Sequence, residues 1–166
     1  MAPPASFAAL GEIELHFVIE QLLARYAHAI DDDRLEDWPG FFAEACRYRI
    51  TSAENEANGL PVGLFFADSR GMLQDRVSAL REANIYEPQR YRHLISAPLL
   101  LERTANEARV QSGFTVIRIM QDGRSSLFAS GRCLDRIALD GTALLFKERL
   151  VVCDSGRIDT LLAIPL

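Results

Sequence analysis

The chain has 166 residues, of which 49% are hydrophobic and 25% are charged, a composition typical of one globular domain with a substantial core. Its formal net charge of −5 argues against nucleic acid or an anionic membrane surface as a partner. No stretch approaches the roughly 18 consecutive apolar residues of a membrane span, and the first residues lack the basic segment and apolar run of a secretory signal. We therefore expect a cytoplasmic protein.

The three cysteines, Cys46, Cys133 and Cys153, lie far apart and each is surrounded by strand-like residues. An odd number of widely spaced cysteines is not the pattern of a disulfide framework. We therefore expect three buried free thiols, which suit a reducing compartment.

The first residues lack periodicity, and residues 1–12 are expected to form a loose lead-in to a single domain over residues 13–166. From Ile13 to about Ile30, apolar residues recur at the spacing of one helix face. This periodicity predicts an amphipathic helix.

Three aspartates follow, and the D-x-x-E pattern of Asp33 and Glu36 predicts the start of a short second helix that carries Trp38. Alternating polar and apolar residues then predict a strand from Cys46 to Thr51. Residues 52–60, rich in Asn, Glu and Ala, are expected to form a loop.

A short apolar strand is predicted from Val62 to Phe66. A third helix should follow, with its apolar face made by Met72, Leu73, Val77 and Leu80.

Beyond Tyr91 the hydrophobic period changes to two, which predicts strands. The candidates are Arg109–Met120, Ser125–Leu139, Ala143–Asp154 and a last strand, Asp159–Ile164. Asp122-Gly123 and Asp140-Gly141 separate the first three of them, and such dipeptides favour tight hairpin turns. Helices followed by a meander predict an α+β fold, with three N-terminal helices packed on one face of a curved antiparallel sheet to form a cone.

Metal sites have little support in the sequence. A Rieske centre requires two cysteines and two histidines from closely spaced loops, whereas no cysteine here lies near a histidine. A mononuclear non-haem iron requires two histidines and a carboxylate on one face. The three histidines are His16, His28 and His93, and the first two are expected on different faces of their helix. We therefore expect neither iron cofactor to be bound by this chain.

A cone of this kind encloses a cavity in which acid–base chemistry could occur. The candidate groups are Tyr26, Asp31, Asp32, Tyr48 and His93. A tyrosine and a histidine beside a carboxylate could polarise a carbonyl and move a proton in a dry cavity. Alternatively, the tyrosines are core aromatics, the aspartates end one helix and cap the next, and the histidine is structural.

An edge rich in arginine and tyrosine precedes the meander, and these residue types are favoured at protein interfaces. The candidate interface residues are Tyr86, Arg90, Tyr91, Arg92 and His93, together with Trp38. The apolar segment from Leu161 to Leu166 is expected to be docked, either on its own sheet or against a neighbouring subunit.

A long ordered series of short motifs carries a family resemblance. The motifs are Trp38–Phe42, Cys46–Arg49, Phe66–Ser69, Asp75–Val77, Leu80–Arg81, Glu82–Tyr86, Arg90–His93, Val152–Ser155 and Asp159–Leu161. Over about residues 17–166 the chain resembles the small (beta) subunits of the bacterial aromatic-ring-hydroxylating dioxygenases, and the terephthalate branch in particular.

The resemblance implies a cone fold of the nuclear-transport-factor-2 or ketosteroid-isomerase type. It also implies trimers of small subunits beneath a trimer of iron-bearing large (alpha) subunits. The Rieske cluster and the mononuclear iron then belong to the large subunit, and this chain supports the assembly without a catalytic residue of its own. The whole complex would convert an aromatic acid to a cis-dihydrodiol with O2 and electrons from NAD(P)H.

Two other hypotheses remain open at this point. The first is a stand-alone dehydratase or isomerase that uses Tyr26, Asp31, Tyr48 and His93 in its cavity. The second is a cone-fold protein that binds a small molecule without chemistry. The arginine-rich and tyrosine-rich edge favours the subunit hypothesis, because a solitary enzyme has no need of it.

Overall fold

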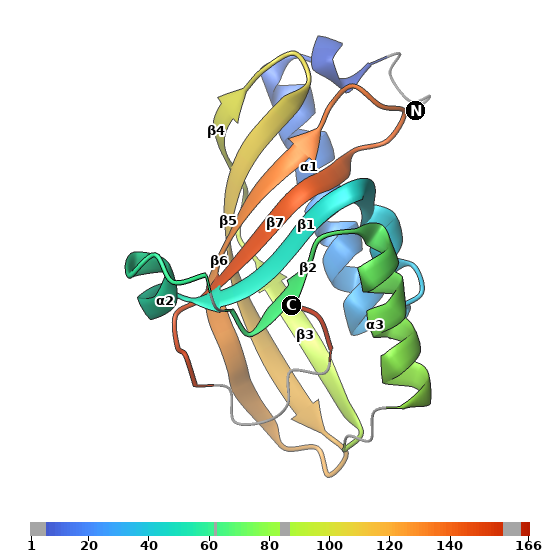
Figure 1. Ribbon diagram of the computed structural model, residues 1–166, viewed down its shortest axis with the longest axis vertical. Coiled ribbons are helices and arrows are strands. Elements are labelled where there is room, and N and C mark those ends of the chain that lie inside the picture. The colour runs from blue at the N-terminus through green and yellow to red at the C-terminus, as the bar shows by residue number, and fades with distance from the viewer. Residues whose placement is uncertain (1–5, 62, 84–86, 158–163) are drawn as a thin grey trace.

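A computed structural model describes residues 6–61, 63–83, 87–157 and 164–166 (Figure 1). Its seven strands form one sheet with the order β2-β1-β7-β6-β5-β3, and β4 also pairs with β5. The strands are β1 (Phe42–Ser52), β2 (Phe65–Ala67), β3 (Gln89–Ile95), β4 (Leu99–Arg103), β5 (Glu107–Met120), β6 (Ser125–Ala138) and β7 (Leu145–Cys153). The α-helices are α1 (Glu12–Asp31), α2 (Ala53–Ala57) and α3 (Arg70–Glu82).

Helix α1 confirms the periodicity of the sequence. Its buried face includes Leu15, Ile19, Leu22 and Tyr26, and it packs on the inner face of the sheet. The lead-in is more ordered than expected over its described residues, because Phe7–Ala9 form a 3-10 helix whose Phe7 is buried.

The short second helix expected from Asp33 and Glu36 is wrong. The chain forms turns there, with Asp33 at a left-handed φ of 58°, and then a 3-10 helix at Trp38–Phe41. Both carboxylates instead accept hydrogen bonds from Arg81 of α3, at 2.9 Å to Asp33 and 2.7 Å to Glu36. Asp33 and Glu36 therefore form ion pairs with the distant Arg81 instead of capping a local helix.

The loop expected over residues 52–60 contains the five-residue helix α2, whose first turn is capped by the hydroxyl of Ser52. In α3, Leu73, Val77 and Leu80 are buried as predicted, whereas Met72 is exposed. The cone is therefore covered by α1 and α3, with the 3-10 helix Trp38–Phe41 between α1 and β1 and the short helix α2 between β1 and β2 (Figure 1).

The three long strands and their hairpin connections are confirmed as β5, β6 and β7. The sheet is nevertheless mixed, because β1 pairs in parallel with β7 while the other pairs are antiparallel. These two strands are far apart in the sequence, so no hairpin forces them to be antiparallel. The last expected strand, Asp159–Ile164, falls almost entirely outside the described residues.

The sheet divides the molecule into two faces. Its inner face packs against the helices and holds the apolar core, while its outer face is open to solvent in the isolated chain (Figure 1). Gly131 of β6 lies against the backbone of β7, and a Cβ atom there would collide with the main-chain oxygen of Val152.

We expect Gly131→Ala to lower the free energy of unfolding by at least about 2 kcal/mol, because the added methyl group must displace a paired strand. Gly40→Ala is the matched control, since no atom lies within 4 Å of the position of its Cβ, and it should change stability by less than about 0.5 kcal/mol. Urea denaturation followed by circular dichroism measures both. Equal stabilities of the two variants would contradict this account of the β6–β7 contact.

Candidate functional site

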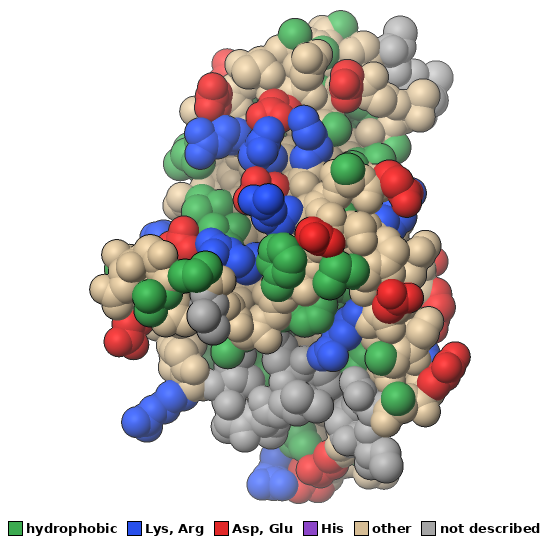
Figure 2. Space-filling model, in the orientation of Figure 1, with side chains coloured by type: hydrophobic (Ala, Val, Ile, Leu, Met, Phe, Trp, Pro, Cys, Tyr) green, Lys and Arg blue, Asp and Glu red, His purple; other side chains and the backbone are tan. Residues whose placement is uncertain are grey.

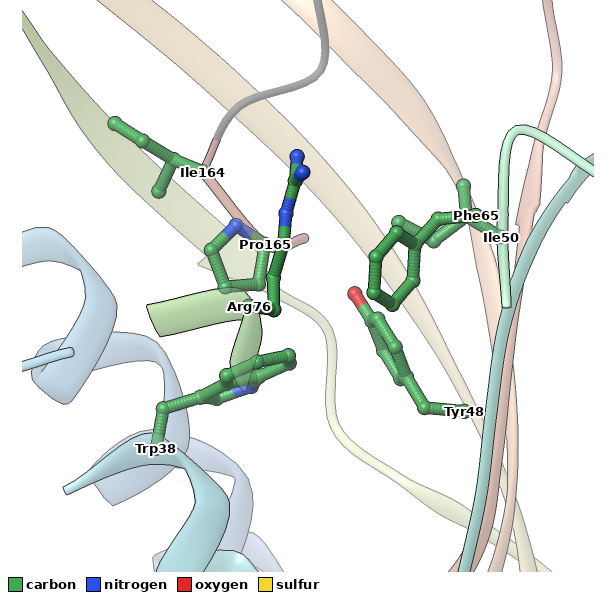
Figure 3. Close-up of a pocket in the computed structure, with 7 residues that line it drawn as sticks. All are labelled: Trp38, Tyr48, Ile50, Phe65, Arg76, Ile164 and Pro165. Carbon is green, nitrogen blue, oxygen red and sulfur yellow. The ribbon is translucent and has the colours of Figure 1, made fainter. Parts of the chain in front are cut away.

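The interior of the cone is filled by the chain itself. Ile164 and Pro165 line a residual cavity together with side chains from the sheet, α3 and the 3-10 helix (Figure 3). Its volume is about 10 Å³, and a single water molecule needs roughly 10–15 Å³. The described structure therefore leaves no room here for an aromatic substrate.

Leu166 is buried and lies among polar groups of the core. Tyr26 and Tyr48 donate their hydroxyl hydrogens to its main-chain oxygen, at 2.8 and 2.9 Å. The Leu166 N–H donates to the hydroxyl of Tyr48 at 3.1 Å, and the indole N–H of Trp38 donates to the hydroxyl of Tyr26 at 3.0 Å. Both candidate catalytic tyrosines thus use their hydroxyls to hold the chain.

A buried ion pair lies beside these tyrosines. Arg149 of β7 donates to Asp135 of β6 at 2.7 Å and to the sulfur of Cys133 at 3.3 Å. Its guanidinium also lies 4.3 Å from the ring centroid of Tyr26, within the range of a cation–π interaction. This cluster was not anticipated, although Asp135 and Arg149 occupy inward-facing positions of two strands that the sequence predicted.

Burial shifts the titration of this cluster. Desolvation raises the pKa of Asp135 to about 6, although the Arg149 guanidinium opposes the shift. Desolvation also raises the pKa of Tyr26 to about 12. The Tyr26 hydroxyl is therefore a poor proton donor at neutral pH, which favours a structural role.

Asp31 and His93 form a separate pair where α1 meets β3. The Nδ1 atom of His93 lies 2.6 Å from Oδ1 of Asp31, and the His93 backbone N–H donates to Oδ2 at 2.9 Å. The side chain of Asp31 is 1% exposed and that of His93 is 2% exposed. Asp31 thus ties the end of α1 to a strand of the sheet, while Asp32 is exposed.

The four proposed catalytic residues therefore do not line one cavity. Tyr48 lines the small cavity of Figure 3, whereas Asp31 and His93 are not among its lining residues. The sequence could not show this, because convergence depends on where each element lies in the fold.

The candidate interface is revised by the structure. Trp38, Tyr91 and His93 are buried inside this chain and cannot be offered to a partner without rearrangement. Arg90 and Arg92 are both exposed at the edge strand β3. The correction follows from strand geometry, because alternate residues of β3 point to opposite faces. Tyr86 lies outside the described residues.

A groove of about 560 Å³ runs between the end of α1 and β3. Its lining includes Asp31–Asp33 on one side and Arg90–Arg92 on the other. The groove therefore has negative charges on the side of α1 and positive charges on the side of β3. This lining suits a polar protein segment better than an aromatic ring.

Cys46, Cys133 and Cys153 are free and buried, as expected. The described residues include no group of three or more His, Cys, Asp and Glu side chains placed to hold a metal ion. Among these residues, no helix combines the length and the apolar content that a bilayer span requires.

The chain is similar in sequence to a family of known proteins. The model of the family described as "Ring hydroxylating beta subunit" matches residues 25–160. The terephthalate 1,2-dioxygenase terminal oxygenase component subunit beta 1 of Comamonas sp is 48% identical over 143 residues, which cover 86% of this chain and 93% of that protein. The anthranilate 1,2-dioxygenase small subunit of Burkholderia cepacia is 37% identical, with coverage of 93% and 96%.

A solved structure shares the fold along nearly its whole length. It is a beta subunit assigned to an aromatic-ring-hydroxylating dioxygenase of Novosphingobium aromaticivorans, with a TM-score of 0.86 and 36% identity. The match covers 93% of this chain and 98% of that chain. The α+β cone expected from the sequence is thereby confirmed, apart from the parallel β1–β7 pair.

We expect Arg149→Met to lower the free energy of unfolding at pH 7 by about 3–5 kcal/mol, because Asp135 is left as an unpaired buried charge. Its pKa is already raised, and removal of the guanidinium raises it further. Since the folded state then binds the proton more tightly than the unfolded state, the loss should be smaller at pH 4 than at pH 7.

The control is the double variant Arg149→Met/Asp135→Leu, which removes both charges at similar volume. It should be at least as stable as the wild type, without the added pH dependence. Urea denaturation at the two pH values measures all three proteins. A single variant as stable as the wild type at pH 7 would contradict the argument.

Proposed function

The chain belongs to the family of ring-hydroxylating beta subunits, and we propose that within its dioxygenase it is a non-catalytic subunit that supports the iron-bearing large subunit. The observation that carries this proposal is the filled cone. Leu166 is buried inside the cone, and both tyrosine hydroxyls donate to its main-chain oxygen.

The substrate of the complex is proposed to be an aromatic acid of the terephthalate, benzoate or anthranilate type. The support is the 48% identity to a terephthalate dioxygenase subunit, against 37% for an anthranilate dioxygenase subunit. The large subunit would hold the Rieske cluster and the mononuclear iron, and it would perform the cis-dihydroxylation with O2 and electrons from NAD(P)H. The complex would act in the cytoplasm.

The proposed assembly contains three large and three small subunits. On the small subunit, the edge strand β3 and its charged groove are proposed to meet the large subunit. An edge strand presents unpaired backbone groups, and Arg92 is exposed there, with its guanidinium 3.8 Å from a carboxylate oxygen of Asp31. The stand-alone enzyme remains an alternative, and the buried Asp31–His93 pair is the observation that favours it.

We expect the double variant Arg90→Ala/Arg92→Ala to retain its folding and to weaken binding to the large subunit about tenfold, because exposed arginines at an interface centre contribute to affinity. Arg25→Ala, an exposed change on α1, is the matched control. Tagged small subunit is captured from its native cells, and the large subunit, iron and acid-labile sulfide are measured. Wild-type levels of all three with the double variant would exclude this interface.

We expect Tyr26→Phe to lower the free energy of unfolding by about 1–3 kcal/mol, because the indole N–H of Trp38 and the oxygen of Leu166 each lose a buried partner. The turnover of the assembled complex, measured per iron, should stay within about twofold of the wild type. A large loss of turnover with assembly intact would instead favour chemistry at this residue.

A further inference from the structure

Polar groups on the outer face of the sheet and polar groups inside the cone have different partners. On the outer face, Lys and Arg side chains lie beside Asp and Glu side chains (Figure 2), and Arg49 and Arg109 each form an ion pair with a glutamate. Inside the cone, two tyrosine hydroxyls instead converge on one main-chain oxygen. Convergent donors of this kind are the means by which proteins bind a carbonyl oxygen or an oxyanion.

The two donors are held in place by separate elements of the fold. Tyr26 comes from α1 and Tyr48 from β1, both side chains are fully buried, and their hydroxyls lie 2.8 and 2.9 Å from the oxygen of Leu166. The indole N–H of Trp38 donates to the hydroxyl of Tyr26 at 3.0 Å. Because this oxygen accepts from Trp38, its own hydrogen is directed to Leu166. The pair of donors is therefore oriented before any ligand arrives.

The walls beside the two hydroxyls are aromatic. Trp38, Tyr48 and Phe65 line the small cavity together with Arg76, whose guanidinium lies 5.3 Å from the ring centroid of Phe65. In Figure 3 the hydroxyl of Tyr48 points toward the side of the cavity on which Pro165 lies. Aromatic walls and a guanidinium next to two donors suit a flat ring that carries a phenolate or carbonyl oxygen.

The segment Ile164–Leu166 closes this site. Its three residues are buried, yet they belong to no helix or strand. Among the described residues, the hydrogen bonds of the segment are those of Leu166 with the two tyrosines. Ile164 lines both the small cavity and the groove of about 560 Å³ between α1 and β3. Displacement of the segment would therefore connect the tyrosine hydroxyls with that groove.

Opposing contributions determine how firmly the segment is held. Burial of the Ile164 and Leu166 side chains favours the closed position, whereas the ordering of three residues opposes it. Once the segment has left, both tyrosine hydroxyls lack the oxygen that they bind in the closed chain, and a buried donor without a partner is costly. Burial raises the pKa of Tyr26 to about 12, so this hydroxyl keeps its proton and remains a donor. The open site thus favours a ligand that supplies an oxygen acceptor.

We propose that Ile164–Leu166 is a displaceable plug, and that the cavity it closes binds a small aromatic molecule with a phenolate or carbonyl oxygen. The ligand oxygen takes the position of the Leu166 oxygen and accepts hydrogen bonds from Tyr26 and Tyr48, while the ring lies against Trp38. The plug lowers the apparent affinity, because only molecules with an open site bind the ligand. This inference goes beyond the proposed function, which holds with the site closed and requires no ligand in this subunit.

The test is the binding of 4-nitrophenol to the purified chain and to two plug variants. Deletion of residues 164–166 removes the plug, and Ile164→Ser/Leu166→Ser weakens its burial in the full chain. Circular dichroism checks the folding of each protein, and titration calorimetry measures the dissociation constant. We expect the plug variants to bind at least about tenfold more tightly than the wild type. Equal affinity in all three, or no binding to the folded plug variants, would overturn the proposal.

A second measurement uses the wild-type chain alone. Trp38 is the one tryptophan of the sequence, so its indole N–H gives a single resonance in a nitrogen–proton correlation spectrum. An excess of 4-nitrophenol should shift this resonance in a saturable manner, because the hydroxyl that accepts from the indole changes its own partner. 4-Nitrotoluene, which lacks the oxygen, should not. The same response to both compounds, or no response to 4-nitrophenol, would refute the site.

The tyrosine hydroxyls are tested in the chain without residues 164–166. Tyr26→Phe/Tyr48→Phe should weaken the binding of 4-nitrophenol about tenfold or more, because its oxygen loses both donors. Tyr91→Phe is the matched control, since it removes a hydroxyl outside the pair that holds Leu166, and it should change the affinity by less than about twofold. A double variant that binds as tightly as its parent would contradict the role of the two hydroxyls.

Discussion

Two tyrosine hydroxyls, one from α1 and one from β1, converge on the main-chain oxygen of Leu166 inside the cone. This arrangement joins the first helix, the first strand and the segment Ile164–Leu166, which are far apart in the sequence. Because buried polar groups must be satisfied, the hydroxyls and the peptide group stabilise one another, and either set alone would be costly to bury. The interior is consequently a packed core in which both tyrosine hydroxyls are bonded to Leu166.

The buried pair of Asp135 and Arg149 extends the same constraint to β6 and β7. An isolated charge in this environment would be strongly disfavoured, so each side chain requires the other. Arg149 also covers the ring of Tyr26, which connects the ion pair to the tyrosine cluster. The polar core is therefore one continuous network, and its members fix how α1 and the sheet lie together.

Because the described interior is packed, we expect the functional contacts of this chain on its surface. The family relationship identifies the chain as the small subunit of a ring-hydroxylating dioxygenase. The groove beside β3 is lined by charged side chains of both signs, from Asp31–Asp33 and Arg90–Arg92.

The sequence by itself determined the elements with strong periodicity: the helix from Ile13 to Ile30, the third helix and the three long strands with their Asp-Gly turns. It also determined the family, because many short motifs in a fixed order are more specific than any one of them. The tertiary structure decided the rest. Asp33 and Glu36 bind Arg81 instead of starting a helix, and β1 pairs in parallel with β7. The hydrogen-bond partners of Tyr26, Asp31 and His93 likewise depended on which groups the fold placed beside them. A local sequence pattern does not indicate partners that are distant in the chain.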